Sequence, residues 1–444
     1  MTEAAHESDS RHPVRRVLTN FGYLMRGRAV AGLLMLAATA LMARTLGPAQ
    51  FGVAMLIESY YLLMRGLFDF NSFDSVVRFG VPLHADGDQH KLQRLIAVCR
   101  RVDRQSMVVG TAVSVLLAPA IGPYIGIEHG AVILLAGYSL VLLTEANNAA
   151  SGVLRLFNRF DALGWQMTIG AAVTFVGVLV GWWLDATLYV FVIIMAVAQA
   201  SENLYLSWRG WREYRQQIGS RLASDVRAHT RVAEFTGLRH FLWMCYWQSN
   251  LDLVPRHLAM LLAGNLLGTA GAGMLRLANQ LSSLLSKSSR LIRDVAFPDL
   301  TRIWLRQREG FARLAYRTAL LGSLVGLTVV VASYLWGADF LRVLVGKKFE
   351  AAAGLLTLML LAATFDLASA PLRAAVYVMG RAGRLVLVYI VSTALYLTLF
   401  VVLSESMSLI GAGVAACAAA AMQFAVMAVI IHLGMRRRAQ EPGR

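Results

Sequence analysis

Charged residues, cysteine and proline are all scarce in this sequence. Of its 444 residues, 15% are charged, nine are proline and three are cysteine. A soluble domain carries about 25% charged residues, so the composition excludes an ordinary soluble fold. Cys99, Cys245 and Cys417 are too scattered for a zinc motif or a disulfide framework. No Gly-x-x-x-x-Gly-Lys-Ser/Thr motif occurs, which argues against direct ATP hydrolysis. The sequence therefore predicts neither a metal nor a cofactor.

Long uncharged runs recur along the chain, such as 108–120, 131–144 and 320–331, and 57% of all residues are hydrophobic. In lipid the backbone must satisfy its own hydrogen bonds, and these runs lack the apolar–polar alternation of a membrane barrel. We therefore expect an all-α polytopic membrane protein. A span needs about 20 residues, which gives about 12 expected spans: 18–43, 49–77, 105–125, 130–152, 162–184, 187–208, 237–262, 267–291, 314–337, 351–375, 384–404 and 409–434.

The net charge of +16 reflects the loops between these spans. Of the 42 lysines and arginines, only Arg44, Arg342, Lys347 and Lys348 fall in loops on one side, while most of the others fall in loops on the opposite side or in the terminal tails. Cytoplasmic loops collect lysine and arginine. We therefore expect both termini in the cytoplasm of a bacterial inner membrane, and no nucleic-acid partner.

A short motif recurs at half the chain length. Residues 46–52 (LGPAQFG) and 267–273 (LGTAGAG) lie 221 positions apart, each between two expected spans. Each half then has six spans, so the halves are parallel repeats related by a pseudo-two-fold axis along the membrane normal. We expect a V-shaped molecule with a central cavity, divided into an N-terminal tail (1–17), an N-lobe (18–208), a basic cytoplasmic linker (209–236), a C-lobe (237–434) and a C-terminal tail (435–444).

The segment 43–52 (ARTLGPAQFG) resembles the signature between the first two spans of the bacterial polysaccharide transporter family. These are the O-antigen and exopolysaccharide flippases of the multidrug/oligosaccharidyl-lipid/polysaccharide exporter superfamily. Looser matches lie at Leu251-Asp252, residues 266–268, Gly273, residues 276–278 and Phe297-Pro298. Many members of the family have fourteen spans, whereas twelve are expected here. The resemblance implies a flippase, not an enzyme, that moves polyprenyl-diphosphate-linked oligosaccharide to the periplasmic leaflet. Membrane lipids and other polysaccharide-assembly proteins would be its partners.

Cations within spans are costly and need a partner, a wet cavity or a route to the interface. We expect Arg26, Arg28, Arg65 and Arg276 to face a central cavity, where a guanidinium can bond a diphosphate bidentately. Two alternatives remain open. Arg26 and Arg28 can snorkel to the headgroups, and Arg65 can be neutralised by Asp69 four residues later.

Acidic residues within spans are candidates for ion coupling, namely Glu58, Glu145 and Asp252. Glu145 has no cation four residues away and is followed by Asn147 and Asn148. It can therefore bind a proton or sodium ion, or serve as a hydrogen-bonded packing residue. Asp252 is four residues from Arg256, so it can equally be part of a structural pair.

Two other functions are weighed against the flippase. A cation-coupled multidrug exporter of the same superfamily would need an acidic cavity, which the excess of arginine within spans disfavours. A membrane glycan polymerase or ligase would need a large outer loop. The longest outer loop expected here, around residues 338–350, is too short for that.

Overall fold

The computed structural model describes residues 13–219, 232–306 and 308–439, of which the side chains at 13–28, 252 and 288–302, with a few others, lie outside the description. All regular structure in these residues is helical. The α-helices are α2 (Pro13–Phe68), α3 (Ser72–Ala85), α4 (Gln89–Tyr124), α5 (Val132–Ser139), α6 (Asn148–Leu156), α7 (Phe160–Trp183), α8 (Leu188–Gln217), α10 (Leu238–Arg306), α11 (Arg308–Val345), α12 (Ala353–Val378) and α13 (Ala382–Ala439). Short 3-10 helices are η1 (His129–Ala131), η2 (Leu140–Glu145), η3 (Val232–Glu234) and η4 (Lys347–Ala352).

Nine described helical stretches are long and apolar enough to cross a membrane. Three of them contain a residue with non-helical backbone angles: Gly47 in α2, Gly268 in α10 and Ser408 in α13. Counting both sides of each break adds three segments to the nine. The sequence predicts about 12 spans, and the described residues contain nine such stretches, three of which are divided by a break.

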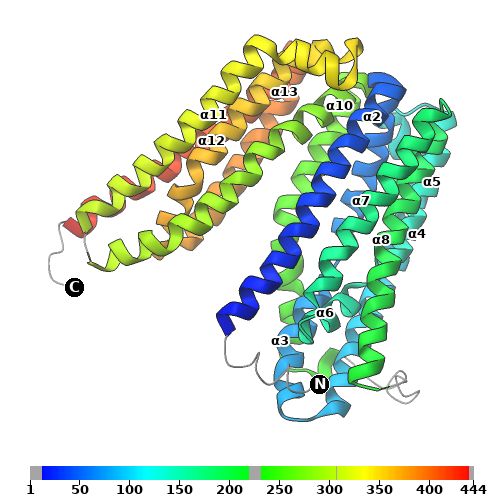
Figure 1. Ribbon diagram of the computed structural model, residues 1–444, viewed down its shortest axis with the longest axis vertical. Coiled ribbons are helices and arrows are strands. Elements are labelled where there is room, and N and C mark those ends of the chain that lie inside the picture. The colour runs from blue at the N-terminus through cyan, green and yellow to red at the C-terminus, as the bar shows by residue number, and fades with distance from the viewer. Residues whose placement is uncertain (1–12, 220–231, 307, 440–444) are drawn as a thin grey trace. The chain divides into compact units, whose positions relative to one another are not determined.

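The chain forms two compact units. Unit 1 comprises Met1–Thr45 and Ile57–His257, and unit 2 comprises Leu46–Leu56 and Leu258–Arg444. In unit 1, α6 packs against α3 and α8, and α7 packs against α8. In unit 2, α11 and α12 lie side by side, and α12 packs against α13 (Figure 1).

The recurring motif has the same backbone conformation in both of its copies. Gly47 has φ 71° and ψ 173°, and Gly268 has φ 69° and ψ 175°. A positive φ is readily adopted only by glycine, so each copy breaks its helix at the same place. Five residues after each break, a second glycine lies against the other copy. A Cβ on Gly52 would lie 1.7 Å from the Thr269 carbonyl oxygen, and one on Gly273 would lie 2.4 Å from the Pro48 carbonyl oxygen.

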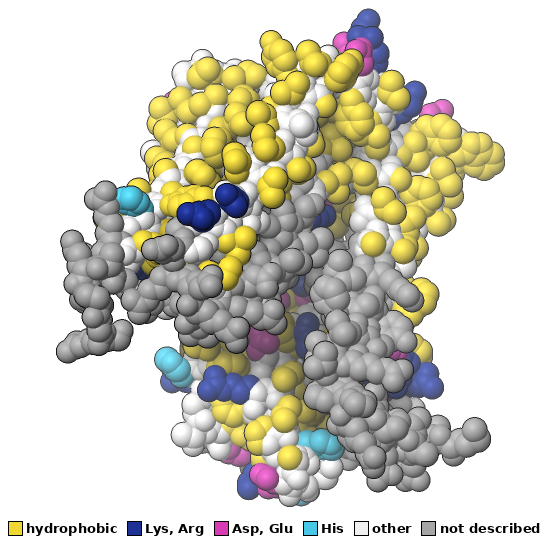
Figure 2. All heavy atoms as spheres, turned by 60° about the vertical axis from the view of Figure 1, so that its left-hand side comes forward, with side chains coloured by type: hydrophobic (Ala, Val, Ile, Leu, Met, Phe, Trp, Pro, Cys, Tyr) yellow, Lys and Arg dark blue, Asp and Glu magenta, His cyan; other side chains and the backbone are white. Residues whose placement is uncertain are grey.

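Much of the described surface is apolar, as expected for helices in lipid. On α11, for example, Leu320, Leu321 and Val325 are each more than half exposed. On the face drawn in Figure 2, hydrophobic side chains form broad areas and the charged ones lie in small groups. Water would make such areas an aggregation hazard, whereas a bilayer solvates them.

The fourth span departs from expectation. The sequence predicted one continuous helix over 130–152, but the structure has α5, then η2, then α6, with Ala146 at ψ 50° and Asn147 at φ −118° between the last two. Non-helical backbone at membrane depth is tolerated when protein groups satisfy it. Here those groups come from other helices, which hydropathy does not detect. In the region predicted as a linker, α8 continues to Gln217 and α10 begins at Leu238, while residues 220–231 lie outside the description.

Candidate functional site

An ion pair within unit 1 joins α2 to the broken fourth span. Arg65 Nε lies 3.2 Å from Glu145 Oε2. The Glu145 side chain is 1% exposed, whereas the Arg65 side chain keeps 38% exposure. The carboxylate is therefore fully buried in the unit, whereas the arginine side chain remains partly accessible.

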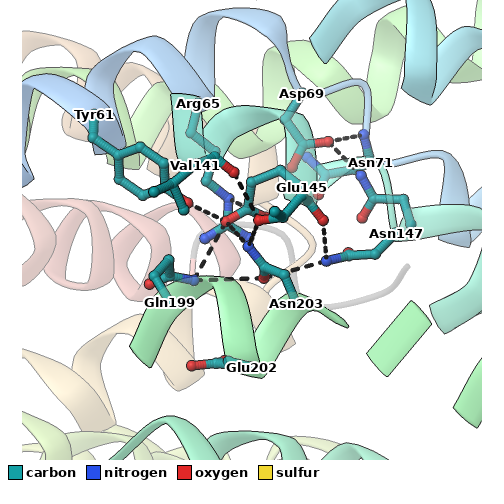
Figure 3. Close-up of polar contacts among 12 residues, drawn as sticks. Tyr61, Arg65, Asp69, Asn71, Val141, Glu145, Asn147, Gln199, Glu202 and Asn203 are labelled. Atoms are coloured by element: carbon teal, nitrogen blue, oxygen red, sulfur yellow. Dashed lines mark hydrogen bonds and ion pairs between the residues drawn. The ribbon is translucent and has the colours of Figure 1, made fainter. Parts of the chain in front are cut away.

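Glu145 is surrounded by hydrogen-bond donors. Its Oε1 accepts from the Tyr61 hydroxyl, from Asn203 Nδ2 at 2.9 Å and from Gln199 Nε2 at 3.4 Å. Figure 3 shows these side chains converging on it from α2 and α8. Together with Arg65 they give both carboxylate oxygens of Glu145 a partner inside the unit.

Asparagine side chains extend the network along the break. Asn203 Nδ2 also donates to Thr144 Oγ1 at 2.9 Å, and Asn147 Nδ2 donates to Asn203 Oδ1 at 3.2 Å. Asn148 Nδ2 donates to Asp69 Oδ1 at 2.6 Å, and the Asn71 N–H reaches the same oxygen at 2.9 Å. These contacts tie η2 to α8, and the start of α6 to α8 and to the segment between α2 and α3 (Figure 3).

A third carboxylate, Glu202 on α8, lies near the pair and interacts electrostatically with both Arg65 and Glu145. Gln166 Nε2 of α7 donates to Glu202 Oε1 at 3.1 Å. A Cβ on Gly170 would lie 2.5 Å from Glu202 Oε2, so the glycine makes room for this acid. With Asp69, which also interacts with Arg65, three acids surround one arginine.

Of the seven candidates named from the sequence, the structure brings Arg65 and Glu145 together. The close ion pair of Arg65 is with Glu145 rather than with Asp69, so the cation that binds Glu145 comes from another helix. Glu58 is half-buried on the same helix as Arg65, and Arg276 is half-buried on α10 in unit 2. The side chains of Arg26, Arg28 and Asp252 lie outside the described residues.

Sequence reasoning missed Tyr61, Gln199, Glu202 and Asn203. One signal was available, since Gln199 and Asn203 are four residues apart in an apolar helix and so share a face. Tyr61 gave none, because a tyrosine in a span usually marks an interface.

The chemistry of the site is that of a charge pair rather than a metal centre. Among the residues that the structure describes, no group of three or more His, Cys, Asp or Glu side chains is placed to hold a metal ion. The contacts to Glu145 all come from donors, so a proton on Glu145 would compete with Arg65. An anion at Arg65 would compete with Glu145 in the same way.

Two solved structures that share this arrangement of helices are membrane transporters. An inward-facing multidrug resistance MATE family transporter of the MOP superfamily aligns with a TM-score of 0.67 and 15% identity over 91% of this chain and 96% of its own. The inward closed lipid II flippase MurJ aligns with a TM-score of 0.70 and 10% identity over 92% and 87%. The chain has the MATE and MurJ transporter fold. Identities this low establish the shared fold alone.

Sequence comparison gives a curated relative with a less specific name. The inner membrane protein YghQ of Escherichia coli strain K12 is 22% identical over 341 residues, which cover 76% of this chain and 94% of YghQ. No family model matches the chain. The MATE and MurJ fold and this relative support a multi-pass inner membrane protein.

Proposed function

We propose that this chain is a flippase that carries a polyprenyl-diphosphate-linked oligosaccharide from the cytoplasmic to the periplasmic leaflet for surface polysaccharide synthesis. The observation that carries the proposal is the unequal burial of the Arg65–Glu145 ion pair. The Arg65 side chain is partly exposed, whereas the Glu145 carboxylate is buried. A guanidinium presents a planar fork to phosphate oxygens. The likeness of the fold to lipid II flippase MurJ supports a lipid-linked cargo.

In this proposal Glu145 holds Arg65 in place when no substrate is bound. An arriving diphosphate takes over part of the guanidinium, and Glu145 then loses its countercharge inside a buried network. A proton bound by Glu145 removes that cost, because a neutral acid needs no cation. Transport is thereby coupled to protonation of Glu145. The other polar groups around the pair are Tyr61, Asp69, Gln199, Glu202 and Asn203.

The test is lipid flipping by the purified full chain in proteoliposomes. The probe is undecaprenyl diphosphate carrying a fluorescently labelled sugar, with the label quenched by a membrane-impermeant reductant. Arg65→Gln should lose most of the flipping, and Arg65→Lys should retain only part of it, because lysine cannot bond phosphate bidentately. Arg44→Gln is the matched control, since Arg44 is an exposed arginine of the same unit. Full flipping by Arg65→Gln would remove Arg65 from the mechanism.

The coupling step has a separate readout. Flipping by the native chain should change with pH, and Glu145→Gln should abolish that change, because glutamine keeps the amide and hydroxyl contacts but cannot titrate. A pH dependence that survives in Glu145→Gln would assign the coupling to another group.

The acids around Arg65 favour a second candidate, a cation-coupled multidrug exporter. Asp69, Glu145 and Glu202 give the described core of unit 1 more potential negative charge than positive. This fits a site for organic cations, and the likeness to MATE transporters supports it. A drug-susceptibility panel on a deletion strain separates the two functions. Increased sensitivity to cationic drugs with unchanged surface glycan would favour the exporter.

A further inference from the structure

The break in the fourth span ends at the N-terminus of α6, and a side chain from another helix caps that N-terminus. Asn147, the residue before α6, makes no side-chain cap. Asp103 of α4, 46 positions away along the chain, accepts the Ala149 N–H at 2.8 Å through Oδ2. A helix N-terminus carries about half a positive charge, so an anion is stabilised there. Asp103 thus takes the place of the local cap that Asn147 does not provide.

Asp103 is a buried acid, and only one of its two carboxylate oxygens makes a well-formed hydrogen bond to the described residues. It is 1% exposed, and its buried Oδ1 makes no well-formed hydrogen bond, although the Ser72 hydroxyl is close enough to donate to the carboxyl group. Its titratable neighbours are Asp69, which follows α2, and Cys99 on its own helix, and the Ser72 side chain lies beside it. None of the ion pairs recorded for the described residues includes Asp103. A buried carboxylate without a cation is costly to keep ionised.

Close packing confines α6 on two sides. A Cβ on Gly152 would lie 2.6 Å from Val76 Cβ of α3, and one on Gly210 of α8 would lie 2.5 Å from the Ala150 carbonyl oxygen. The helix therefore has little freedom to move sideways. A movement of the N-terminus of α6 would therefore shift its junction with η2. Glu145 lies at that junction, four residues before Ala149.

We propose that Asp103 is a proton-binding positioning residue that holds the broken fourth span and thereby sets the geometry of the Arg65–Glu145 pair. A proton taken up from water forms an O–H bond at Oδ1 and gives the neutral acid, while Oδ2 still accepts the Ala149 N–H. The neutral acid has lost its charge attraction to the N-terminus of α6, so its hold on that helix weakens. Only the consequence for transport rests on the proposed function.

The first measurement is difference infrared spectroscopy of the full chain in lipid nanodiscs. Between about pH 5 and about pH 8, a buried carboxyl that titrates changes its C=O stretch. Asp103→Asn should lose one such band, and Asp86→Asn should retain it, since Asp86 is exposed in a loop. An unchanged set of bands in Asp103→Asn would show that Asp103 does not take up a proton in this range, and the proposal would be wrong.

The second measurement is hydrogen exchange of the segment 146–156 followed by mass spectrometry. Asp103→Ala removes the acceptor of a buried N–H, so exchange there should become roughly tenfold faster. Asp103→Asn keeps an acceptor oxygen but has no charge, so its exchange rate should lie between those of the native chain and Asp103→Ala, which separates capping from general misfolding. Equal exchange in Asp103→Ala and the native chain would overturn the positioning role.

Neither measurement uses a transport substrate, so the two proposals can fail separately. If the labelled lipid is not flipped but the infrared band and the exchange behave as expected, Asp103 retains its role and the flippase assignment fails. If flipping occurs but the infrared bands of Asp103→Asn and their pH dependence equal those of the native chain, the flippase assignment holds. Asp103 is then an ordinary buried acid.

Discussion

At the scale of single residues, both halves of the chain place an acid at the same position of the repeat. Glu145 and Asp366 lie 221 positions apart, the same spacing as Gly47 and Gly268. Each is bound by an arginine, but the arginines differ. Arg65 comes from another element and remains 38% exposed, whereas Arg373 is on the same helix as Asp366 and is 10% exposed. Only the first pair leaves its cation open to a ligand.

The second pair is therefore expected to serve stability. Arg373 Nη1 donates to Asp366 Oδ1 at 2.7 Å, and Nη2 donates to the Asp366 carbonyl at 3.1 Å, across the turn that contains Pro371. Asp366→Leu leaves Arg373 without its carboxylate partner, so we expect the free energy of unfolding to fall by about 2 kcal/mol. The loss is smaller than for a fully buried pair because the Asp366 side chain is 32% exposed. Thermal unfolding in detergent, followed by tryptophan fluorescence, measures this loss.

The matched control for that measurement is the double variant Asp366→Leu with Arg373→Met. It removes both charges, so it should recover much of the lost stability. If Asp366→Leu unfolds at the same temperature as the native chain, the Asp366–Arg373 ion pair does not stabilise the fold.

Residue-scale prediction from the sequence finds both members of the central pair but not their pairing. Arg65 and Glu145 stand out because charge within a span is costly. The four-residue rule then assigns Arg65 to Asp69, since that rule describes only contacts along one helix. Glu145 is 80 positions further along the chain. No periodicity in a single sequence shows that α2, η2 and α8 meet, so the donors Tyr61 and Asn203 are missed.

At the scale of helices, the most specific feature is the crossing of the two motif copies in unit 2. Gly52 and Gly273 each face the backbone of the other copy with no room for a side chain. Small residues allow helix backbones to approach closely in membranes, where packing is the main attraction between helices. The crossing is symmetric in the sequence. Gly52 faces Thr269, which is four positions before Gly273, and Gly273 faces Pro48, which is four positions before Gly52.

Substitution of either crossing glycine should therefore be destabilising. For Gly52→Ala and Gly273→Ala we expect losses of roughly 2–3 kcal/mol each, because a methyl group would force two backbones apart. Gly32→Ala is the control in the same helix as Gly52. No atom lies within 4 Å of its added Cβ, so it should be neutral or slightly stabilising. Thermal unfolding of the three purified variants decides the matter, and equal stability of Gly52→Ala and Gly32→Ala would contradict the close crossing.

The helices themselves are largely predictable, and the exceptions have physical causes. Apolar runs of about 20 residues identify spans because lipid requires them. The repeated glycine motif marks two of the three breaks, since only glycine readily adopts positive φ. Ser408 breaks α13 at φ 51° without such a signal. The break in the fourth span escapes prediction because its contacts come from other helices: Asp103 accepts the Ala149 N–H, and Asn203 donates to the Thr144 hydroxyl.

At the scale of the whole chain, composition and the half-chain motif are sufficient to predict the correct fold class. Both the all-helical structure with its nine membrane-length stretches and the likeness to MATE and MurJ transporters agree with that prediction. The cargo does not follow in the same way, because one fold serves several substrates and the deciding residues form a small part of the chain.

Membrane orientation is the remaining whole-chain prediction, and the direction of transport depends on it. The basic loops place Asp86 in the cytoplasm and Lys347 in the periplasm. Both residues are exposed, so single cysteines there can be labelled once Cys99, Cys245 and Cys417 are replaced by alanine. With a membrane-impermeant maleimide that passes the outer membrane, Lys347→Cys should react in intact cells and Asp86→Cys only after the inner membrane is permeabilised. The reverse pattern would invert every span and overturn the orientation predicted from the basic loops.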